Sequence, residues 1–153
     1  MTSAAGPMTP CATIGESFSE RVTFDAKSIR DFATLTGDFI PLHHDEATAV
    51  RSPFGSLIVS GPHVTALMLG MTATHFCKRC APLGLEFTIR FVRAITAGTT
   101  LDLRWTLIEL TPKASLKGDL ATLEGRALDE AGGVYVSSRG LLLLRPLDRD
   151  RGG

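Results

Sequence analysis

The stretch SPFGSLIVSGPHVTALMLGMTATHFC, Ser52–Cys77, contains no Asp, Glu, Lys or Arg, although the 153-residue chain has 16 acidic and 16 basic residues. Its length alone would permit a membrane span. However, the turn-forming segments SPFG and SGPH interrupt it, so the unbroken apolar part is too short. Gly61 precedes and Pro62 opens a predicted helix, whose apolar residues recur at helical spacing: Val64, Leu67, Met68 and Met71. The stretch therefore predicts a helix buried on nearly every side inside a soluble domain.

After this helix the hydrophobic period changes from 3.6 to 2, which is typical of strands. The segment LEFTIRF, Leu85–Phe91, alternates apolar and polar residues and predicts a half-buried antiparallel strand. The segment TTLDLRWTLIEL alternates in the same way and then changes phase at Ile108, as a bulge would cause. Two more strands are predicted at LATLEGRAL and VYVSSRGLLLL, joined by a turn at DEAGG.

The residues before the uncharged stretch predict one strand and two short helices. The strand is SFSERVTF, and Asp25 is a candidate N-cap for a helix that Gly37 ends. A loop through Pro41 leads to a second helix, which Asp45 caps. One strand, then helices, then four strands is the order of an α+β fold. We expect an antiparallel sheet wrapped around one long buried central helix.

Composition limits the classes of function. The hydrophobic content of 44% and charged content of 21% are those of one globular domain. Balanced charge predicts no nucleic-acid partner and no anionic membrane. Three cysteines are too few for a disulfide framework, so a reducing cytoplasm is predicted. The start MTSAAGPMTP lacks the features of a signal peptide. We expect a flexible tail over residues 1–12, a domain over 13–146 and a second flexible tail over 147–153.

The segment TLTGDFIPLHHDE, Thr34–Glu46, crowds ionisable side chains into a short turn. Asp38 follows a helix-ending glycine, and His43 follows a proline, so the connection can fold the two side chains toward each other. A carboxylate beside an imidazole can share one water, with one group removing a proton while the other delivers one. An imidazole also changes protonation state near neutral pH. The alternative interpretation is that both side chains only satisfy backbone groups of a polar loop.

The longer segment FATLTGDFIPLHHDEATA, followed by FGSLIVSG, resembles the signature of the MaoC-like, (R)-specific enoyl-CoA hydratase family, also called hydratase 2. The residues that fit its first block are Phe32, Leu35, Thr36, Gly37, Asp38, Pro41, Leu42, His43 and Ala49. Those that fit its second block are Phe54, Gly55, Ile58 and Gly61. The resemblance implies a hotdog fold, normally dimeric. It also implies reversible addition of water to trans-2-enoyl thioesters, without a cofactor or a metal.

The resemblance also implies a role for individual residues. Asp38 and His43 would carry the acid/base pair, and the Gly61 backbone N–H would polarise the thioester carbonyl. A helix start offers free N–H groups and a positive dipole to the developing enolate. The residues expected to line the substrate site are Ile40, Pro41, Phe54, Gly55, Ser60 and His63. The family's Asn falls at Ile40, whose side chain cannot form a hydrogen bond.

Other groups of residues have competing interpretations. The segment HFCKRC contains a CxxC with a nearby histidine, but it lies at the carboxyl end of the predicted helix, where the dipole disfavours a thiolate. The only spare cysteine ligand for zinc is Cys11, in the predicted tail. His63 either lines the pocket as a neutral imidazole, its pKa lowered by the helix start, or packs with a backbone hydrogen bond. We predict no metal or redox site.

Three functions therefore compete. The first is an enoyl-thioester hydratase or dehydratase. The second is a hotdog thioesterase or an acyl-carrier-protein dehydratase, which usually places a carboxylate on the central helix, and Pro62–Phe76 contains none. The third is a non-catalytic subunit that binds acyl thioesters. The expected substrate is a thioester of coenzyme A or of an acyl carrier protein. Open sheet edges predict a homodimer or a higher oligomer built from dimers.

Overall fold

The computed structural model describes residues 11–148. Its helical segments are α1 (Ala26–Leu35), the 3₁₀ turn η1 (Pro41–His43), α2 (Glu46–Arg51), α3 (Gly61–Phe76) and the 3₁₀ turn η2 (Ala114–Leu116). Its strands are β1 (Ser17–Phe24), β2 (Cys80–Phe91), β3 (Thr99–Lys113), β4 (Gly118–Leu128) and β5 (Val134–Pro146). The predicted order of one strand, helices and four strands is confirmed, and the first strand has the predicted bounds. The connection through Pro41, predicted as a loop, is a 3₁₀ turn.

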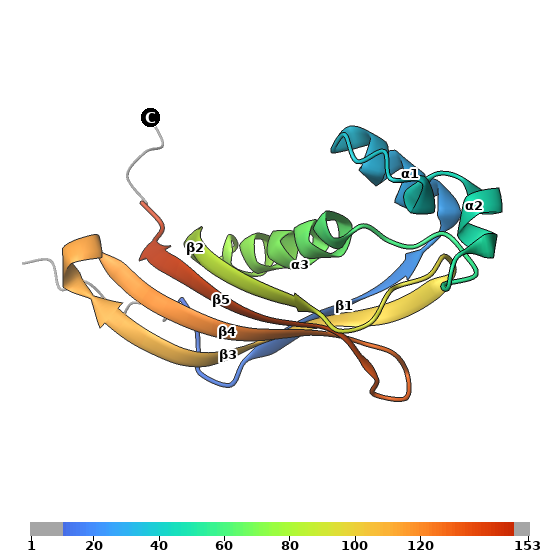
Figure 1. The fold of residues 1–153 in the computed structure, drawn as a ribbon. Helices are drawn as coiled ribbons and strands as arrows, with labels where there is room; N and C mark the ends of the chain where they lie inside the picture. The colour runs from blue at the N-terminus through green and yellow to red at the C-terminus, as the bar shows by residue number, and fades with distance from the viewer. Residues whose placement is uncertain (1–10, 149–153) are drawn as a thin grey trace, which may run out of the picture.

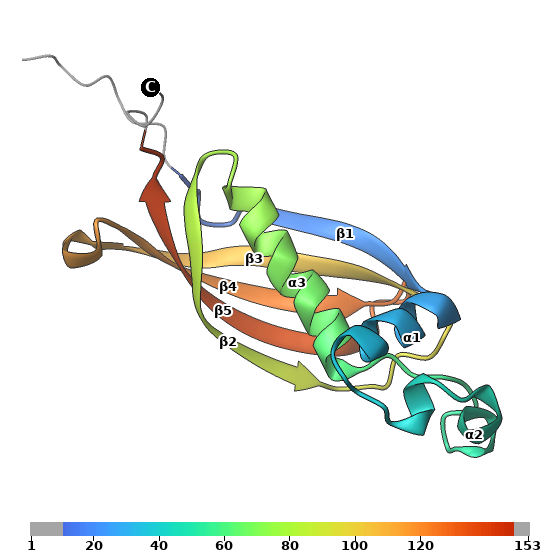
Figure 2. The same cartoon turned by 90° about the horizontal axis from the view of Figure 1, so that it is seen from above.

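The five strands form one antiparallel sheet in the order β1-β3-β4-β5-β2, so that β1 and β2 are its edges. The sheet is curved, and α3 lies along its concave face (Figure 1). Helices α1 and α2 lie at the end of the sheet where α3 begins (Figure 2). This arrangement confirms the predicted α+β class and the central helix inside a curved sheet.

Trp105 of β3 fixes α3 to the sheet. Its side chain is fully buried, and its Nε1–H donates a hydrogen bond of 2.8 Å to the carbonyl oxygen of Met68 in α3. The register of β3 with β4 shifts between Leu107 and Glu109, which confirms the bulge predicted from the change of phase at Ile108. Beyond the bulge, Leu110 is partly buried against the core, whereas the rest of the strand end is exposed.

The prediction that α3 is buried on nearly every side is wrong for the single chain. The face toward the sheet is buried and includes Val64, Met68 and Met71. The opposite face is exposed and consists of small or uncharged residues, among them Pro62, Ala66, Gly70 and Ala73. One curved sheet can cover only one side of a helix, and the sequence pattern does not say what covers the other. No helix within residues 11–148 is long and apolar enough to cross a membrane.

Two further expectations need correction. Leu85 and Phe91, predicted to face the core, are exposed, whereas Phe87 and Ile89 between them are partly buried. Leu85 lies at a register shift of β2 against β5 between Gly84 and Glu86, and Phe91 is the last residue of this edge strand. Ala12 is buried in the core, so packing begins before the predicted domain start at residue 13. The remaining parts of the predicted tails, residues 1–10 and 149–153, lie outside the described residues.

Candidate active site

Asp38 is placed by the end of α1. The helix begins at the predicted cap, where Asp25 accepts a hydrogen bond of 2.7 Å from the N–H of Ser28. It ends at Leu35 with Thr36 as its C-cap, and the following Gly37, with a positive φ of 72°, turns the chain. The N–H of Asp38 then donates back to the carbonyl oxygen of Ala33 at 2.8 Å. The backbone of Asp38 is therefore held against the last turn of α1.

The carboxylate of Asp38 faces the imidazole of His43. Oδ1 accepts a hydrogen bond of 3.2 Å from the N–H of Ile40, and Oδ2 lies 3.4 Å from Nε2 of His43. The turn η1 makes this possible, because its N–H at His43 donates to the carbonyl oxygen of Ile40 at 3.0 Å. The structure thus brings Asp38 and His43 together, as the sequence predicted.

His43 is buried, and its ring orientation is set from the other side. Nδ1 lies 2.7 Å from the carbonyl oxygen of Ile58, which precedes α3. A carbonyl oxygen only accepts, so Nδ1 carries the proton and Nε2 of a neutral ring is an acceptor. Nε2 and the carboxylate of Asp38 then both need a donor. A water molecule that gives one hydrogen to each would satisfy both, and such a water is also activated as a nucleophile.

The start of α3 lies close to this pair. Ile58, which holds the imidazole, precedes Gly61 by three residues, which span at most about 11 Å of backbone. The N–H of Gly61 donates to no acceptor within residues 11–148. The helix starts at Gly61, with Ser60 at the N-cap, so Pro62 is its second residue rather than its first. A free N–H at the positive end of a 16-residue helix can stabilise an oxyanion.

The predicted lining residues are only partly brought together. Phe54 and Gly61 line one hollow of about 360 Å³, together with Phe91 and Arg93. Asp38 and His43 are not among its lining residues. The side chains of Ile40 and Pro41 are exposed beside the Asp38 turn, and Gly55 occupies a turn with a φ of 69°. Ser60 and His63 are both buried.

His63 packs between aromatic rings rather than lining an open pocket. Its imidazole stacks on Phe32 of α1 at 4.5 Å and meets the ring of Phe24 edge-on at 5.4 Å. The predicted backbone hydrogen bond is missing at Nδ1, which has no partner among the described residues. Burial, and not the predicted effect of the helix start, lowers the pKa of His63. His63 therefore joins α3 to α1 as a neutral ring.

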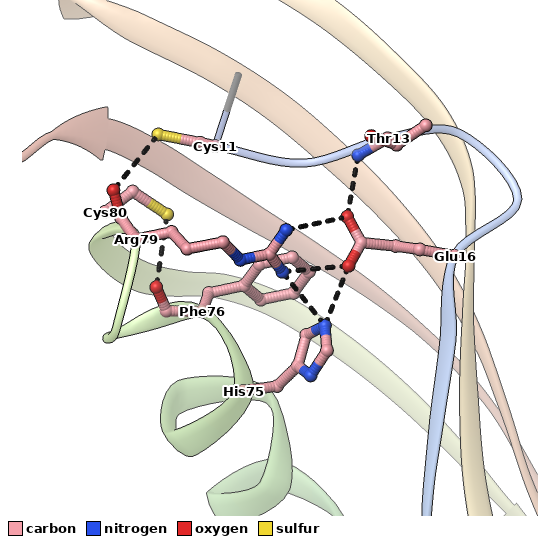
Figure 3. A network of polar contacts seen from close by, with 7 residues as sticks. All are labelled: Cys11, Thr13, Glu16, His75, Phe76, Arg79 and Cys80. Carbon is pink, nitrogen blue, oxygen red and sulfur yellow. Dashed lines mark hydrogen bonds and ion pairs between the residues drawn. The ribbon is translucent and has the colours of Figure 1, made fainter. Parts of the chain in front are cut away.

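Cys11 and Cys80 lie near the carboxyl end of α3 (Figure 3), whereas Asp38 lies near the end where α3 begins. Cys77 is exposed at the C-cap, while Cys80 is buried, and burial raises the pKa of the Cys80 thiol to about 12. Cys11 packs beside them, with Sγ 3.9 Å from the carbonyl oxygen of Arg79, so its assignment to a floppy tail is wrong. No group of three or more His, Cys, Asp or Glu that could hold a metal occurs in the described part of the chain.

The sequence analysis missed a second ionic cluster at the same end (Figure 3). Oε2 of Glu16 lies 2.8 Å from Nε2 of His75 and 2.8 Å from Nη2 of Arg79. Burial alone would raise the pKa of Glu16, but hydrogen bonds from Arg79 and His75 outweigh it and lower this pKa to about 2. Arg79 follows His75 by four residues, in the turn after α3, but their partner Glu16 is 59 residues from His75 in sequence. This cluster fastens the segment before β1 to the end of α3.

Comparison with known proteins adds family relationships to this geometry. The family model described as MaoC like domain matches residues 11–123. The 3-hydroxybutyryl-CoA dehydratase of Methylorubrum extorquens is 30% identical over 105 residues, which cover 63% of this chain and 66% of that relative, just under two thirds of its length.

Solved structures give the same result for the fold. The R-hydratase PhaJ1 of Pseudomonas aeruginosa has a TM-score of 0.80 at 22% identity, covering 90% of this chain and 86% of that chain. The MaoC-like dehydratase of Rhodospirillum rubrum has a TM-score of 0.72 at 26% identity, covering 89% of this chain and 96% of that chain. These similarities confirm the predicted hotdog fold.

Proposed function

The chain belongs to the MaoC-like domain family, and we propose on this premise that it is a hydratase that adds water reversibly to trans-2-enoyl thioesters. The observation that carries the proposal is the pair of acceptors, Nε2 of His43 and Oδ2 of Asp38, at 3.4 Å. A dehydratase activity in the relative from Methylorubrum extorquens supports the same chemistry. We further propose that the product is the (R)-3-hydroxyacyl thioester, which is consistent with the resemblance to the (R)-specific hydratases.

The proposed reaction uses the two side chains and one backbone N–H. Nε2 of His43 accepts a proton from water while the water oxygen bonds to C3 of the enoyl thioester. The electron pair of the C2–C3 double bond moves toward the carbonyl oxygen, which the N–H of Gly61 stabilises. The imidazolium then returns its proton to C2. The carboxylate of Asp38 orients the water and stabilises the imidazolium, and both side chains end as they began.

The test is turnover of short and medium trans-2-enoyl-CoA, followed by the loss of enoyl-thioester absorbance, with product chirality read from the same samples. We expect the (R) product from the wild type and loss of turnover in Asp38→Asn. The matched control is Asp31→Asn, which changes an exposed carboxylate of α1 and should leave turnover intact. A folded wild type that binds the thioesters without converting them would instead favour the non-catalytic binding subunit.

We propose that the protein is a homodimer. The exposed face of α3 carries no charge, and the outer edge of β2 presents exposed apolar side chains at Leu83, Leu85 and Phe91. An uncovered apolar face beside an open strand edge favours association with a second copy. We expect a dimer in sedimentation equilibrium. Ala66→Glu, at the exposed middle of α3, should weaken it, and a monomeric wild type at micromolar concentration would contradict the proposal.

A further inference from the structure

Arginines gather on the convex face of the sheet, opposite the face along which α3 lies (Figure 1). Arg104 of β3 lies directly opposite Arg126 of β4, and both are exposed between buried neighbours. In the same cross-strand row, Arg126 is opposite Ser137 of β5, and Ser137 is opposite Arg90 of β2. Arg139 follows Ser137 by two residues and so points to the same side of the sheet. We call Arg90, Arg104, Arg126 and Arg139 the arginine face.

Most of the charge of the arginine face is not neutralised within residues 11–148. Arg90, Arg104 and Arg126 form no ion pair there. Like charges directly opposite each other on neighbouring strands destabilise a sheet, so the opposition of Arg104 and Arg126 indicates a partner that supplies negative charge. Two carboxylates on this side of the sheet are already paired with other arginines: Glu124 with Arg139 at 3.9 Å, and Asp102 with Arg21 at 3.6 Å.

A hollow of about 310 Å³ lies in the arginine face, so its charges border a space that a partner can enter. Arg90, Arg126 and Arg139 line it, together with Glu124 and Ser137. Pockets for small molecules are mostly apolar, whereas this lining is polar and its arginines are exposed. The row from Arg90 to Arg104 also crosses four strands, which is about 14 Å. This breadth and polarity suit ion pairs with another macromolecule.

The carboxylate of Glu124 favours an acidic protein over a nucleic acid as this macromolecule. Glu124 lies inside the hollow, among three arginines. A nucleic-acid backbone carries negative charge at every phosphate, so Glu124 would repel it wherever it crossed the hollow. An acidic protein surface carries separate carboxylates for the arginines and can place a lysine opposite Glu124.

The arginine face adjoins the hollow that contains Gly61. Phe91 follows Arg90 at the end of β2 and points to the other side of the sheet, where its ring borders Gly61. The strand ends at Phe91, and the next residues, Val92 and Arg93, line the hollow of about 360 Å³ together with Gly61. A flexible arm from a partner on the arginine face would therefore reach Gly61 by passing round the end of β2.

We propose that the arginine face docks the acidic surface of a carrier protein, which delivers the enoyl thioester on a flexible arm. The inference rests on the proposed function, and it names the carrier of the thioester as a protein rather than coenzyme A. Opposite charges on the two surfaces accelerate association more than they raise affinity, and salt screens them. Docking is therefore fast at low ionic strength and weak at high ionic strength.

The kinetic test compares one acyl group on three carriers. The trans-2-butenoyl group is attached to an acyl carrier protein, to coenzyme A, or to pantetheine, which has neither protein nor phosphate. In Arg126→Glu, we expect kcat/KM for the protein-bound substrate to fall about tenfold relative to that for the pantetheine substrate. The matched control is Lys113→Glu, the same change of charge at the exposed far end of β3, which should leave this ratio unchanged. A fall confined to the coenzyme A substrate would assign the arginine face to phosphates and overturn protein docking.

A binding test requires no turnover. The Kd of fluorescently labelled butyryl carrier protein should rise about tenfold in Arg126→Glu, and it should rise with salt on the wild type. Arg126→Glu places opposite charges across β3 and β4, so urea unfolding should show no loss of stability. If this variant does not fold, Arg90→Glu on the edge strand serves instead.

The outcomes of the binding test separate the two proposals. Salt-dependent binding that Arg126→Glu weakens, in a wild type without turnover, would keep the docking surface and overturn the hydratase proposal. The docking surface would be overturned if the carrier protein did not bind, or if it bound Arg126→Glu and Lys113→Glu equally well. Displacement of the carrier protein by a double-stranded DNA oligonucleotide would overturn it as well, in favour of a nucleic-acid partner.

Discussion

Nε2 of His43 faces Oδ2 of Asp38 at 3.4 Å, while Nδ1 of the same ring is committed to the carbonyl oxygen of Ile58 at 2.7 Å. The contact of Nδ1 with Ile58 determines whether Nε2 of a neutral ring can donate a hydrogen bond to Asp38. Because Nδ1–H is held by a carbonyl, the neutral ring presents a lone pair toward a carboxylate, and the two groups repel unless a proton donor joins them. For the neutral ring, a bound water that donates one hydrogen to each group would join them.

We predict that His43→Ala lowers kcat for enoyl-thioester hydration by about a hundredfold or more, because a positioned acid/base group contributes about that much. The control is His44→Ala. Nε2 of His44 contacts the carbonyl oxygen of Asp38 at 2.7 Å, so its loss should cost only the order of one hydrogen bond, about tenfold or less. The measurement is kcat with saturating substrate. Equal losses of kcat in both variants would mean that His43 is not the acid/base group of the reaction.

We predict that the apolar residue at position 40 does not impair the site. The N–H of Ile40, not its side chain, holds Oδ1 of Asp38 at 3.2 Å, and the side chain is 53% exposed. Ile40→Asn should therefore change kcat/KM by no more than about twofold, as for an ordinary surface change.

Ile40→Pro provides the matched test of that N–H. The φ of Ile40 is −60°, which proline adopts without strain, so this variant removes mainly the hydrogen-bond donor. We expect kcat/KM to fall about tenfold. A large gain in Ile40→Asn, or no loss in Ile40→Pro, would show that the side chain rather than the backbone governs Asp38.

We predict that Gly61 is required because of the ring beside it. A Cβ at this position would lie 2.8 Å from Cζ of Phe91, which is closer than real Cβ atoms come. Gly61→Ala should therefore displace either the ring or the start of α3 and lower kcat. Because Phe91 is exposed, Phe91→Ala should fold, and the double variant should recover activity relative to Gly61→Ala. Absence of recovery in this double-mutant cycle would mean that the ring is not the cause.

Features set by local sequence were predicted well. The caps at Asp25 and Asp45 and the bulge near Ile108 each depend on a few neighbouring residues, and the structure has all three. The turn that joins Asp38 to His43 is also local, which is why the candidate pair could be recognised in the sequence. The spacing alone left open whether this pair is catalytic or only part of a polar loop. The resemblance to a family signature then supplied the expected reaction and residue roles.

Features set by tertiary position were missed. Leu85 is exposed at a register shift of β2 against β5, which the alternation of the sequence does not reveal. The contact of His43 with Ile58 spans 15 residues, and the opposition of Arg104 and Arg126 becomes visible only when the register of β3 with β4 is known. The partner of His75 lies 59 residues away, so that cluster could not be inferred from the helix alone.

We predict that Glu16→Gln destabilises the fold at neutral pH. The pKa of Glu16 is lowered from 4.5 to about 2, a difference that corresponds to about 3 kcal/mol. Because the side chain is 18% exposed, screening by solvent reduces our expectation to about 2 kcal/mol. The measurement is urea unfolding at pH 7. The control is Glu46→Gln, which breaks an exposed pair with Arg30 and should cost less than about 0.5 kcal/mol.

The pH dependence of this difference tests its cause. A carboxyl group whose folded pKa is lowered binds its proton more readily in the unfolded chain, so its stabilisation is complete above about pH 4.5 and disappears as the pH falls toward 2. The gap in unfolding free energy between wild type and Glu16→Gln should therefore narrow from pH 5 to pH 3. A gap that stays constant over this range would mean that Glu16 acts through packing and not through its charge on His75 and Arg79.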